Sequence, residues 1–128
     1  MNVIVCNERK ELNTLNIDII KAVDGVYSVE ELVGMFTNFF FNKMILDVTS
    51  IKDYNDYSNI KKLFENVDPS KVILYLNEST NNKEYKSDLI TLGLYNFTTD
   101  FNEIMELFNN PKKYDDVKNE IKDKDQLM

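Results

Sequence analysis

The chain has 128 residues, with 15 lysines and arginines against 22 aspartates and glutamates, and its formal net charge is -7. This length suits a single domain, and no stretch approaches the roughly 18 consecutive apolar residues that a membrane span needs. Because the chain contains no histidine, Ser-His-Asp and Cys-His catalysis, a histidine phosphodonor and histidine-ligated zinc are all excluded. The acidic balance also argues against a nucleic-acid partner, whose phosphates would be repelled.

Cysteine usage and the N-terminus indicate a cytoplasmic protein. The single cysteine, Cys6, cannot form an internal disulfide, and the first residues lack the basic start and the cleavage site of a secretory signal. The sole arginine, Arg9, offers little for bidentate phosphate recognition. With three glycines in the chain, a glycine-rich phosphate loop is not expected.

Short apolar runs rich in β-branched residues predict the strands. In chain order they cover residues 3–6, 17–23, 44–48 and 72–76, and a weaker fifth candidate covers 94–98. Apolar residues follow one another in these runs instead of alternating with polar ones. That pattern is typical of strands covered on both faces.

Helical spacing of apolar residues separates the strands. A short helix is expected between Glu8 and Asn16, with Leu12 and Leu15 as its apolar contacts. Longer helical stripes cover residues 29–40, 57–67, 85–92 and 101–108, and Pro69, Gly93 and Pro111 follow the last three of them. The second helix begins with a capping-box pattern, Ser28 followed by Glu31. In the triplet 39–41 of phenylalanines, one ring should lie at the surface.

A strand followed by a helix, repeated five times, predicts right-handed crossovers and a parallel sheet. We therefore expect an α/β, doubly wound, three-layer sandwich with the flavodoxin-like strand order 2-1-3-4-5 over residues 1–110. Residues 111–128 are expected to form a charged linker or a marginal C-terminal helix. A thin apolar stripe of Val117, Ile121 and Leu127 would serve that helix.

Ligands of an open parallel sheet bind at the carboxyl ends of the strands. The polar residues expected there are Asn7 and Glu8, Asp24, Asp47 with Thr49 and Ser50, Asn77 and Glu78, and Thr98, Thr99 and Asp100. Since strands 1 and 3 should be neighbours, Glu8 and Asp47 could share one pocket. Two carboxylates there would favour Mg²⁺, and without a cation the pKa of one of them would rise.

In its order of elements and its strand-end acid, the chain resembles a receiver domain of the CheY-like response-regulator superfamily over residues 1–110. That family has an acidic pair after strand 1, a phosphoacceptor aspartate ending strand 3, a hydroxyl residue ending strand 4, and a lysine followed by proline after strand 5. Asn7 and Glu8 occupy the acidic pair here, and Asp47 occupies the phosphoacceptor position. Half of the acidic pair is therefore missing.

The other positions of the receiver pattern also differ. Leu76 replaces the hydroxyl residue, Asp100 stands near the lysine position, and Phe101 stands at the proline. Phosphoryl transfer needs positive charge around the developing phosphate, and Asp100 adds negative charge instead. The resemblance thus implies a pseudo-receiver without catalytic residues or a cofactor, in which Asp47 is an inactive phosphoacceptor position and no metal is expected. The alternative is a phosphorylatable receiver that holds Mg²⁺ with Glu8 and Asp47.

Degenerate receivers of this kind resemble the N-terminal domains of MinD/ParA-like ATPases of the TadZ/CpaE type, found in pilus and secretion assembly. The resemblance implies a regulatory, localisation or protein-interaction module that docks on a protein partner, on its own downstream domain or on a second copy. The expected interaction face, formed by helix 4, strand 5 and helix 5, includes Tyr85, Tyr95, Phe97, Ile104 and Phe108. A third hypothesis is a flavodoxin-like cofactor binder, but the loop at 7–10 lacks the Ser/Thr/Gly run that cradles a phosphate.

Overall fold

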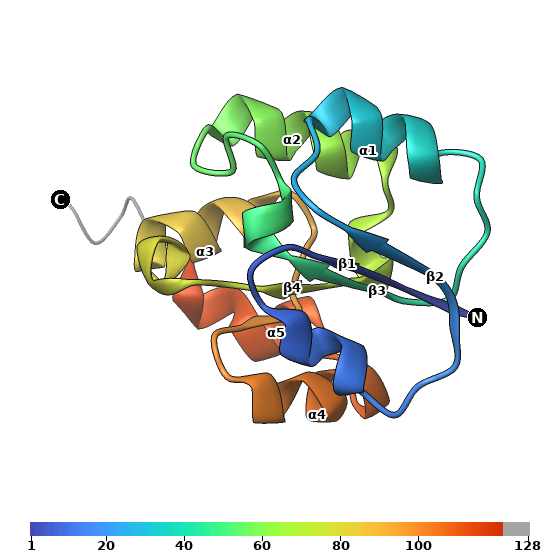
Figure 1. The fold of residues 1–128 in the computed structure, drawn as a ribbon. Coiled ribbons are helices and arrows are strands. Elements are labelled where there is room, and N and C mark those ends of the chain that lie inside the picture. Colours follow the sequence, from blue (N-terminus) through green and yellow to red (C-terminus); the bar gives the residue numbers. More distant parts are fainter. Residues whose placement is uncertain (122–128) are drawn as a thin grey trace, which may run out of the picture.

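The computed structural model describes residues 1–121, which form one five-stranded sheet with helices around it (Figure 1). Its strands are β1 (Asn2–Cys6), β2 (Ile19–Asp24), β3 (Met44–Asp47), β4 (Val72–Tyr75) and β5 (Phe97–Thr98). All neighbouring pairs are parallel, and the order is β2-β1-β3-β4-β5. The predicted flavodoxin-like, CheY-like α/β architecture is confirmed.

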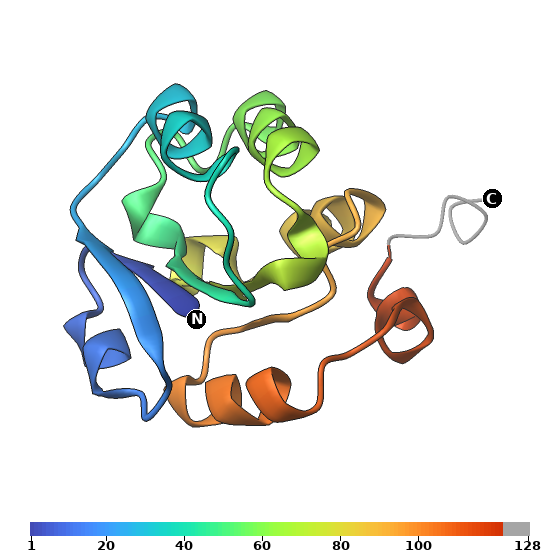
Figure 2. The same ribbon diagram turned by 90° about the vertical axis from the view of Figure 1, so that its right-hand side faces the viewer.

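Helices cover both faces of the sheet (Figure 2). One layer consists of α1 (Val29–Phe36), α2 (Tyr57–Asn66) and α3 (Lys83–Thr91). The other consists of the 3₁₀ helix η1 (Lys10–Thr14) and of α4 (Ile104–Asn109). The chain then forms α5 (Tyr114–Val117) beside α3. Shorter 3₁₀ turns are η2 (Val48–Ser50), η3 (Pro69–Lys71), η4 (Glu78–Thr80), η5 (Phe101–Glu103) and η6 (Lys118–Glu120).

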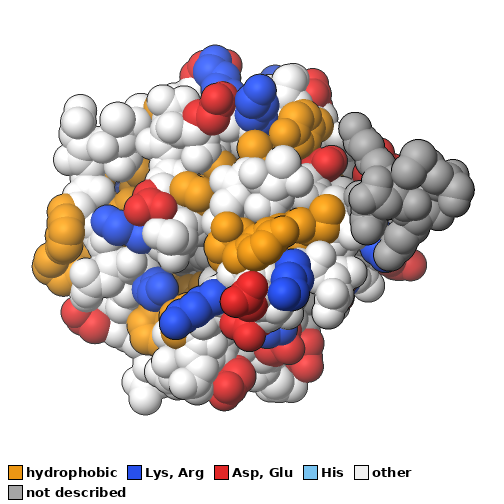
Figure 3. All heavy atoms as spheres, turned by 180° about the vertical axis from the view of Figure 1, so that it is seen from behind, with side chains coloured by type: hydrophobic (Ala, Val, Ile, Leu, Met, Phe, Trp, Pro, Cys, Tyr) orange, Lys and Arg blue, Asp and Glu red, His pale blue; other side chains and the backbone are white. Residues whose placement is uncertain are grey.

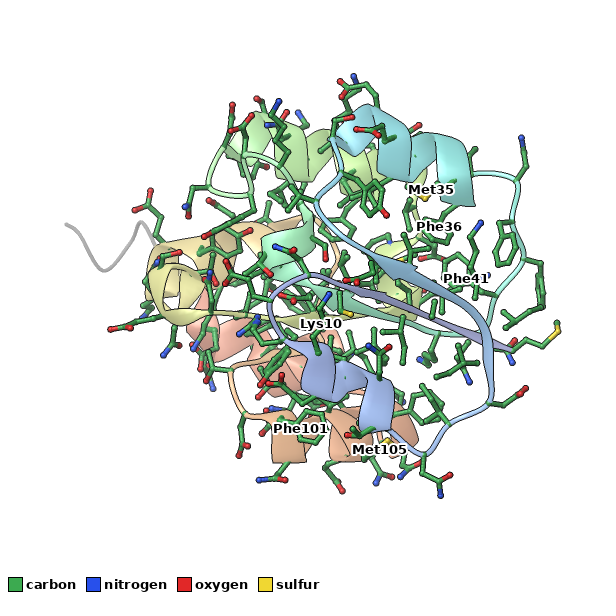
Figure 4. All side chains as sticks on the ribbon, in the orientation of Figure 1. Lys10, Met35, Phe36, Phe41, Phe101 and Met105 are labelled. Carbon is green, nitrogen blue, oxygen red and sulfur yellow. The ribbon has the colours of Figure 1, made fainter. Side chains whose placement is uncertain are left out.

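The sheet separates two hydrophobic cores. The larger core lies under α1, α2 and α3, and the smaller one lies under η1 and α4. Figure 4 shows side chains of both layers: Met35, Phe36 and Phe41 lie on the α1 side, and Phe101 and Met105 lie on the α4 side. Every residue of the three central strands is buried, as their uninterrupted apolar runs predict.

The two edge strands differ from the prediction. In β2 partly buried residues alternate with exposed ones, and Ile20 is 49% exposed. The reason is that β2 has a neighbour on one side only, and its pairing with β1 shifts register between Asn2 and Val3. At the other edge, only Phe97 and Thr98 of the expected strand 94–98 form β5. Short or bulged edge strands are common because they resist pairing with other chains.

Several helix ends follow the expected local signals, but α1 ends at Phe36 and not at residue 40 as expected. Ser28 and Glu31 form the predicted capping box, in which the Ser28 Oγ accepts from the Glu31 N–H and the Glu31 carboxylate accepts from the Ser28 N–H. After α3, Gly93 adopts a φ of +91°, a conformation that glycine enters without steric cost. In the phenylalanine triplet, Phe40 is 66% exposed while Phe41 is buried. One ring at the surface was the prediction.

The segment after Asn110 returns to the β5 side of the sheet. The Asn96 side chain accepts from the Lys112 N–H at 2.8 Å and donates to the Lys112 carbonyl at 3.3 Å. The rings of Tyr95 and Tyr114 meet edge to face with centres 6.0 Å apart, and Val117 is buried. Leu127, the last residue of the expected stripe, lies outside the described residues. Within residues 1–121 no helix is long and apolar enough to cross a membrane.

Candidate functional site

The carboxyl ends of β1, β3 and β4 meet around the carboxylate of Asp47. Asp47 ends β3, and its side chain has no solvent exposure. One oxygen, Oδ1, accepts hydrogen bonds from the N–H of Thr49 at 3.0 Å and from its hydroxyl at 2.8 Å. Asp47 thereby caps the turn η2 that follows its own strand.

The loop after β1 encloses the second oxygen of the same carboxylate. The backbone N–H groups of Asn7 and Arg9 both donate to Asp47 Oδ2, each at 3.1 Å. The Asn7 side chain donates to the Thr49 carbonyl, and the Glu8 N–H donates to the Thr49 hydroxyl. Three backbone N–H groups and the Asn7 side chain therefore hold this loop against the end of β3.

Arg9 lies between Asp47 and the end of β4. Its Nε donates to Asp47 Oδ1 at 3.0 Å, and this ion pair is largely buried, with side chains 18% and 0% exposed. The two terminal nitrogens donate to main-chain carbonyls, Nη1 to Leu76 at 3.0 Å and Nη2 to Tyr75 at 2.6 Å. The guanidinium carbon also lies 4.0 Å from the centre of the Tyr75 ring. One cation thus joins the ends of β1, β3 and β4.

These contacts determine the charge state of the site. Burial raises the pKa of Asp47, but hydrogen bonds from Asn7, Thr49 and Arg9 outweigh it, and the pKa lies below its usual value. Asp47 is therefore ionised at neutral pH, and its charge is balanced by that of Arg9. Burial, followed by the nearby Glu11 carboxylate, raises the pKa of Tyr75, whose hydroxyl donates to Glu11 at 3.2 Å.

The structure does not join the two predicted metal ligands. Glu8 is exposed, and the side chain that reaches Asp47 is Arg9. Within residues 1–121, no three His, Cys, Asp or Glu side chains are grouped so that they could hold a metal ion. Magnesium needs several oxygen ligands free to face it, whereas both Asp47 oxygens are engaged and a guanidinium lies against one of them. The residues present therefore do not fit Mg²⁺.

The other strand-end residues take structural positions. Asp24 pairs with Lys10, which Figure 4 labels at the start of η1. Asn77 caps η4, and Asp100 is exposed and caps η5. Leu76, at the hydroxyl position of the receiver pattern, has no exposed surface. Ser50 is also buried, and its hydroxyl finds no hydrogen-bond partner within the described part of the chain.

The predicted interaction face is only partly available as surface. Ile104 is fully buried in the smaller core, and Phe108 packs against that core. Tyr85 and Phe97 pack against the larger core, and Tyr95 contacts the returning Tyr114. Seen from behind in Figure 3, hydrophobic side chains form separate bands among charged ones, not one continuous apolar surface.

Sequence reasoning missed the role of Arg9. The signal was present, because the only arginine of the chain stands three residues after β1, at the strand end nearest Asp47. A guanidinium at that place can reach a carboxylate and two neighbouring carbonyls together, which a lysine cannot do with the same geometry. Comparisons of the chain with family models, with curated proteins and with solved structures gave no match.

Proposed function

We propose that this chain is a non-catalytic, receiver-like interaction module. The observation that supports the proposal most directly is the Arg9 guanidinium lying against Asp47, where a working receiver would need a metal ion and an incoming phosphoryl group. The module would act through its surfaces, as a regulatory, localisation or protein-docking domain. The fold alone does not separate this function from others, so the argument rests on the site.

The chemistry of the site disfavours phosphoryl transfer. An attacking carboxylate needs an oxygen free to approach phosphorus in line. Both Asp47 oxygens already accept hydrogen bonds, and the Asp47 side chain has no solvent exposure. The positive charge that would stabilise the transferred phosphoryl group is already neutralised by Asp47 itself. Displacing Arg9 would break its hydrogen bonds to two β4 carbonyls as well.

The response to a phosphate would also be missing. In a receiver, a hydroxyl at the end of strand 4 follows the phosphate, and the buried Leu76 cannot do so. Asp100, near the lysine position, is exposed and caps its own turn. Even if Asp47 were phosphorylated, no hydroxyl side chain at the end of β4 would therefore respond to the phosphate.

We further propose, from the resemblance to receiver-like domains of MinD/ParA-like ATPases, that the partner is a protein, either separate or a downstream domain of the same polypeptide. A cytoplasmic location is part of this proposal. What supports it is cysteine usage, since the single cysteine cannot form an internal disulfide. A second copy bound through α3, β5 and α4 is the other partner that we consider.

Amide NMR with beryllofluoride and Mg²⁺ tests the proposal. The expected result is no specific shift of the Asn7 and Thr49 amides at millimolar Mg²⁺, since their acceptor Asp47 remains paired with Arg9. The matched control is an Asp47→Asn variant, which identifies any shift that depends on the carboxylate. Saturable shifts of both amides in the parent chain that disappear in this variant would establish the phosphorylatable receiver instead.

A further inference from the structure

The start of α2 and α3 are neighbours on the same side of the sheet (Figures 1 and 2). A groove lies between their side chains. Its inner hollow, of about 20 Å³, is lined by Tyr57 and Ile60 on one side and by Tyr85, Asp88 and Leu89 on the other. That volume suits a single water-sized group. A wider hollow of about 270 Å³ adjoins it and shares Tyr57, Tyr85 and Asp88.

The walls of the groove are held by hydrogen bonds that cross between loops. The Tyr85 hydroxyl donates to the Tyr54 carbonyl at 2.8 Å, and the Asn77 side chain donates to the Tyr54 hydroxyl at 3.0 Å. Burial raises the pKa of Tyr85, so this hydroxyl keeps its proton over the physiological range. Tyr57, by contrast, is 42% exposed and offers a ring face at the rim. The groove is therefore preformed, with one fixed and one exposed tyrosine.

The charge of the groove has one sign. Four acidic residues line it and its adjoining loop: Asp53, Asp56, Glu84 and Asp88. Among the described residues that line it, none is lysine or arginine, and none of the four acids takes part in a described ion pair. Burial, and then the negative charge of Glu84, raises the pKa of Asp88. A cation beside Asp88 would counter this rise in pKa, because it favours the ionised carboxylate.

We propose that this α2–α3 groove binds a lysine-containing basic segment of a partner protein, with one lysine side chain between Tyr57 and Tyr85 and its ammonium at Asp88. The inference rests on the proposed function, because it names the partner chemistry of an interaction module. A lysine fits on three counts. Its ammonium is close to water in size, its stem can lie along apolar surface, and tyrosine rings and carboxylates both attract it.

The test uses the full chain and a short fluorescein-labelled peptide of alternating lysine and serine, with a glutamate–serine peptide as the charge control. Binding is followed by fluorescence anisotropy and located by amide NMR. The groove variant is Glu84→Gln with Asp88→Asn. The matched control variant, Glu65→Gln with Glu120→Gln, changes the net charge equally at exposed positions outside the groove.

We expect the lysine peptide to shift the amides of Tyr57, Tyr85 and Asp88, and the groove variant to bind it about tenfold more weakly. The control variant should keep nearly the parent affinity. Equal losses in the two variants would mean that the peptide responds to net charge only, and would overturn the inference. Shifts confined to other surfaces would overturn it as well.

Two further arms separate the possible failures. If the groove amides shift with protein concentration in the absence of peptide, the occupant is a second copy and the inference of a separate partner is wrong.

Beryllofluoride and Mg²⁺ are then added to the same samples. Asp47-dependent shifts of Asn7 and Thr49 would refute the non-catalytic function without affecting the peptide result. If the lysine peptide does not bind and no Asp47-dependent shifts occur, only the inferred binding of a basic segment in the groove is refuted.

Discussion

At the residue scale, the buried Arg9–Asp47 ion pair carries a desolvation cost that its other contacts must offset. Removing two charges from water costs several kcal/mol per ion, and only good geometry with further hydrogen bonds offsets that cost. Asp47 accepts five hydrogen bonds here, two of them from Thr49 and one from Asn7. Arg9 adds two bonds to β4 carbonyls and a contact with a tyrosine ring. The pair is thus well compensated, and breaking it should be costly.

The first mutational prediction concerns this pair. Arg9→Met keeps an apolar stem but leaves Asp47 buried without its counter-ion, and we expect the free energy of unfolding to fall by about 3 kcal/mol. Urea denaturation measures it. Lys10→Met, which breaks the exposed pair with Asp24, is the matched control and should leave the urea midpoint nearly unchanged.

A double-mutant cycle checks the cause of that loss. If the lost counter-ion is responsible, Asp47→Asn should be less destabilising in the Arg9→Met background than in the parent chain, with a coupling of about 1 kcal/mol or more. Additive effects of the two substitutions would contradict the energetic coupling of Arg9 and Asp47.

At the element scale, the strands that could be predicted well are those buried on both faces of the sheet. The central strands β1, β3 and β4 are covered on both faces, so an uninterrupted apolar run identifies them. The edge strand β2 shows such a run too, yet its Ile20 is half-exposed. This exposure was not predictable, because an apolar run does not indicate which strand lacks a second neighbour. Capping signals such as Ser28 with Glu31 are local, and for that reason they were predictable.

The β5 edge gives a prediction at the same scale. The Asn96 amide bonds to both backbone groups of Lys112, so it holds the returning segment much as a neighbouring strand would. In Asn96→Ala, the Lys112 amide should lose its hydrogen-exchange protection, while the Leu76 amide, bonded to the Thr98 carbonyl, keeps it. Unchanged protection of Lys112 would show that other contacts hold the segment.

At the scale of the whole molecule, the sequence located the site but not its occupant. Parallel strands bring their carboxyl ends together, so Asp47 and the loop after β1 were predictable neighbours. Which side chain of that loop turns inward depends on its backbone path, and the pattern favoured Glu8 where the structure places Arg9. The α2–α3 groove was beyond prediction, because it arises from the packing of two helices distant in sequence.

The whole domain is a flavodoxin-like α/β sandwich in which the central cation at the strand ends is the side chain of Arg9. Arg9 links the ends of β1, β3 and β4 as part of the chain itself, whereas a metal ion would bind reversibly. Such a domain would present one set of surfaces at all times. Its partner would then be selected by surface chemistry, and the acidic α2–α3 groove is the candidate surface that the structure offers.

The central claim is that Arg9 takes the place of a metal ion at Asp47. Titration with Mn²⁺ is its most direct test. Manganese shares the oxygen preference of magnesium, and its unpaired electrons broaden the NMR signals of nearby amides. We expect millimolar Mn²⁺ to leave the NMR signals of the Asn7 and Thr49 amides as sharp as those of amides in the central strands. Selective broadening of both amides that disappears in Asp47→Asn would contradict this claim.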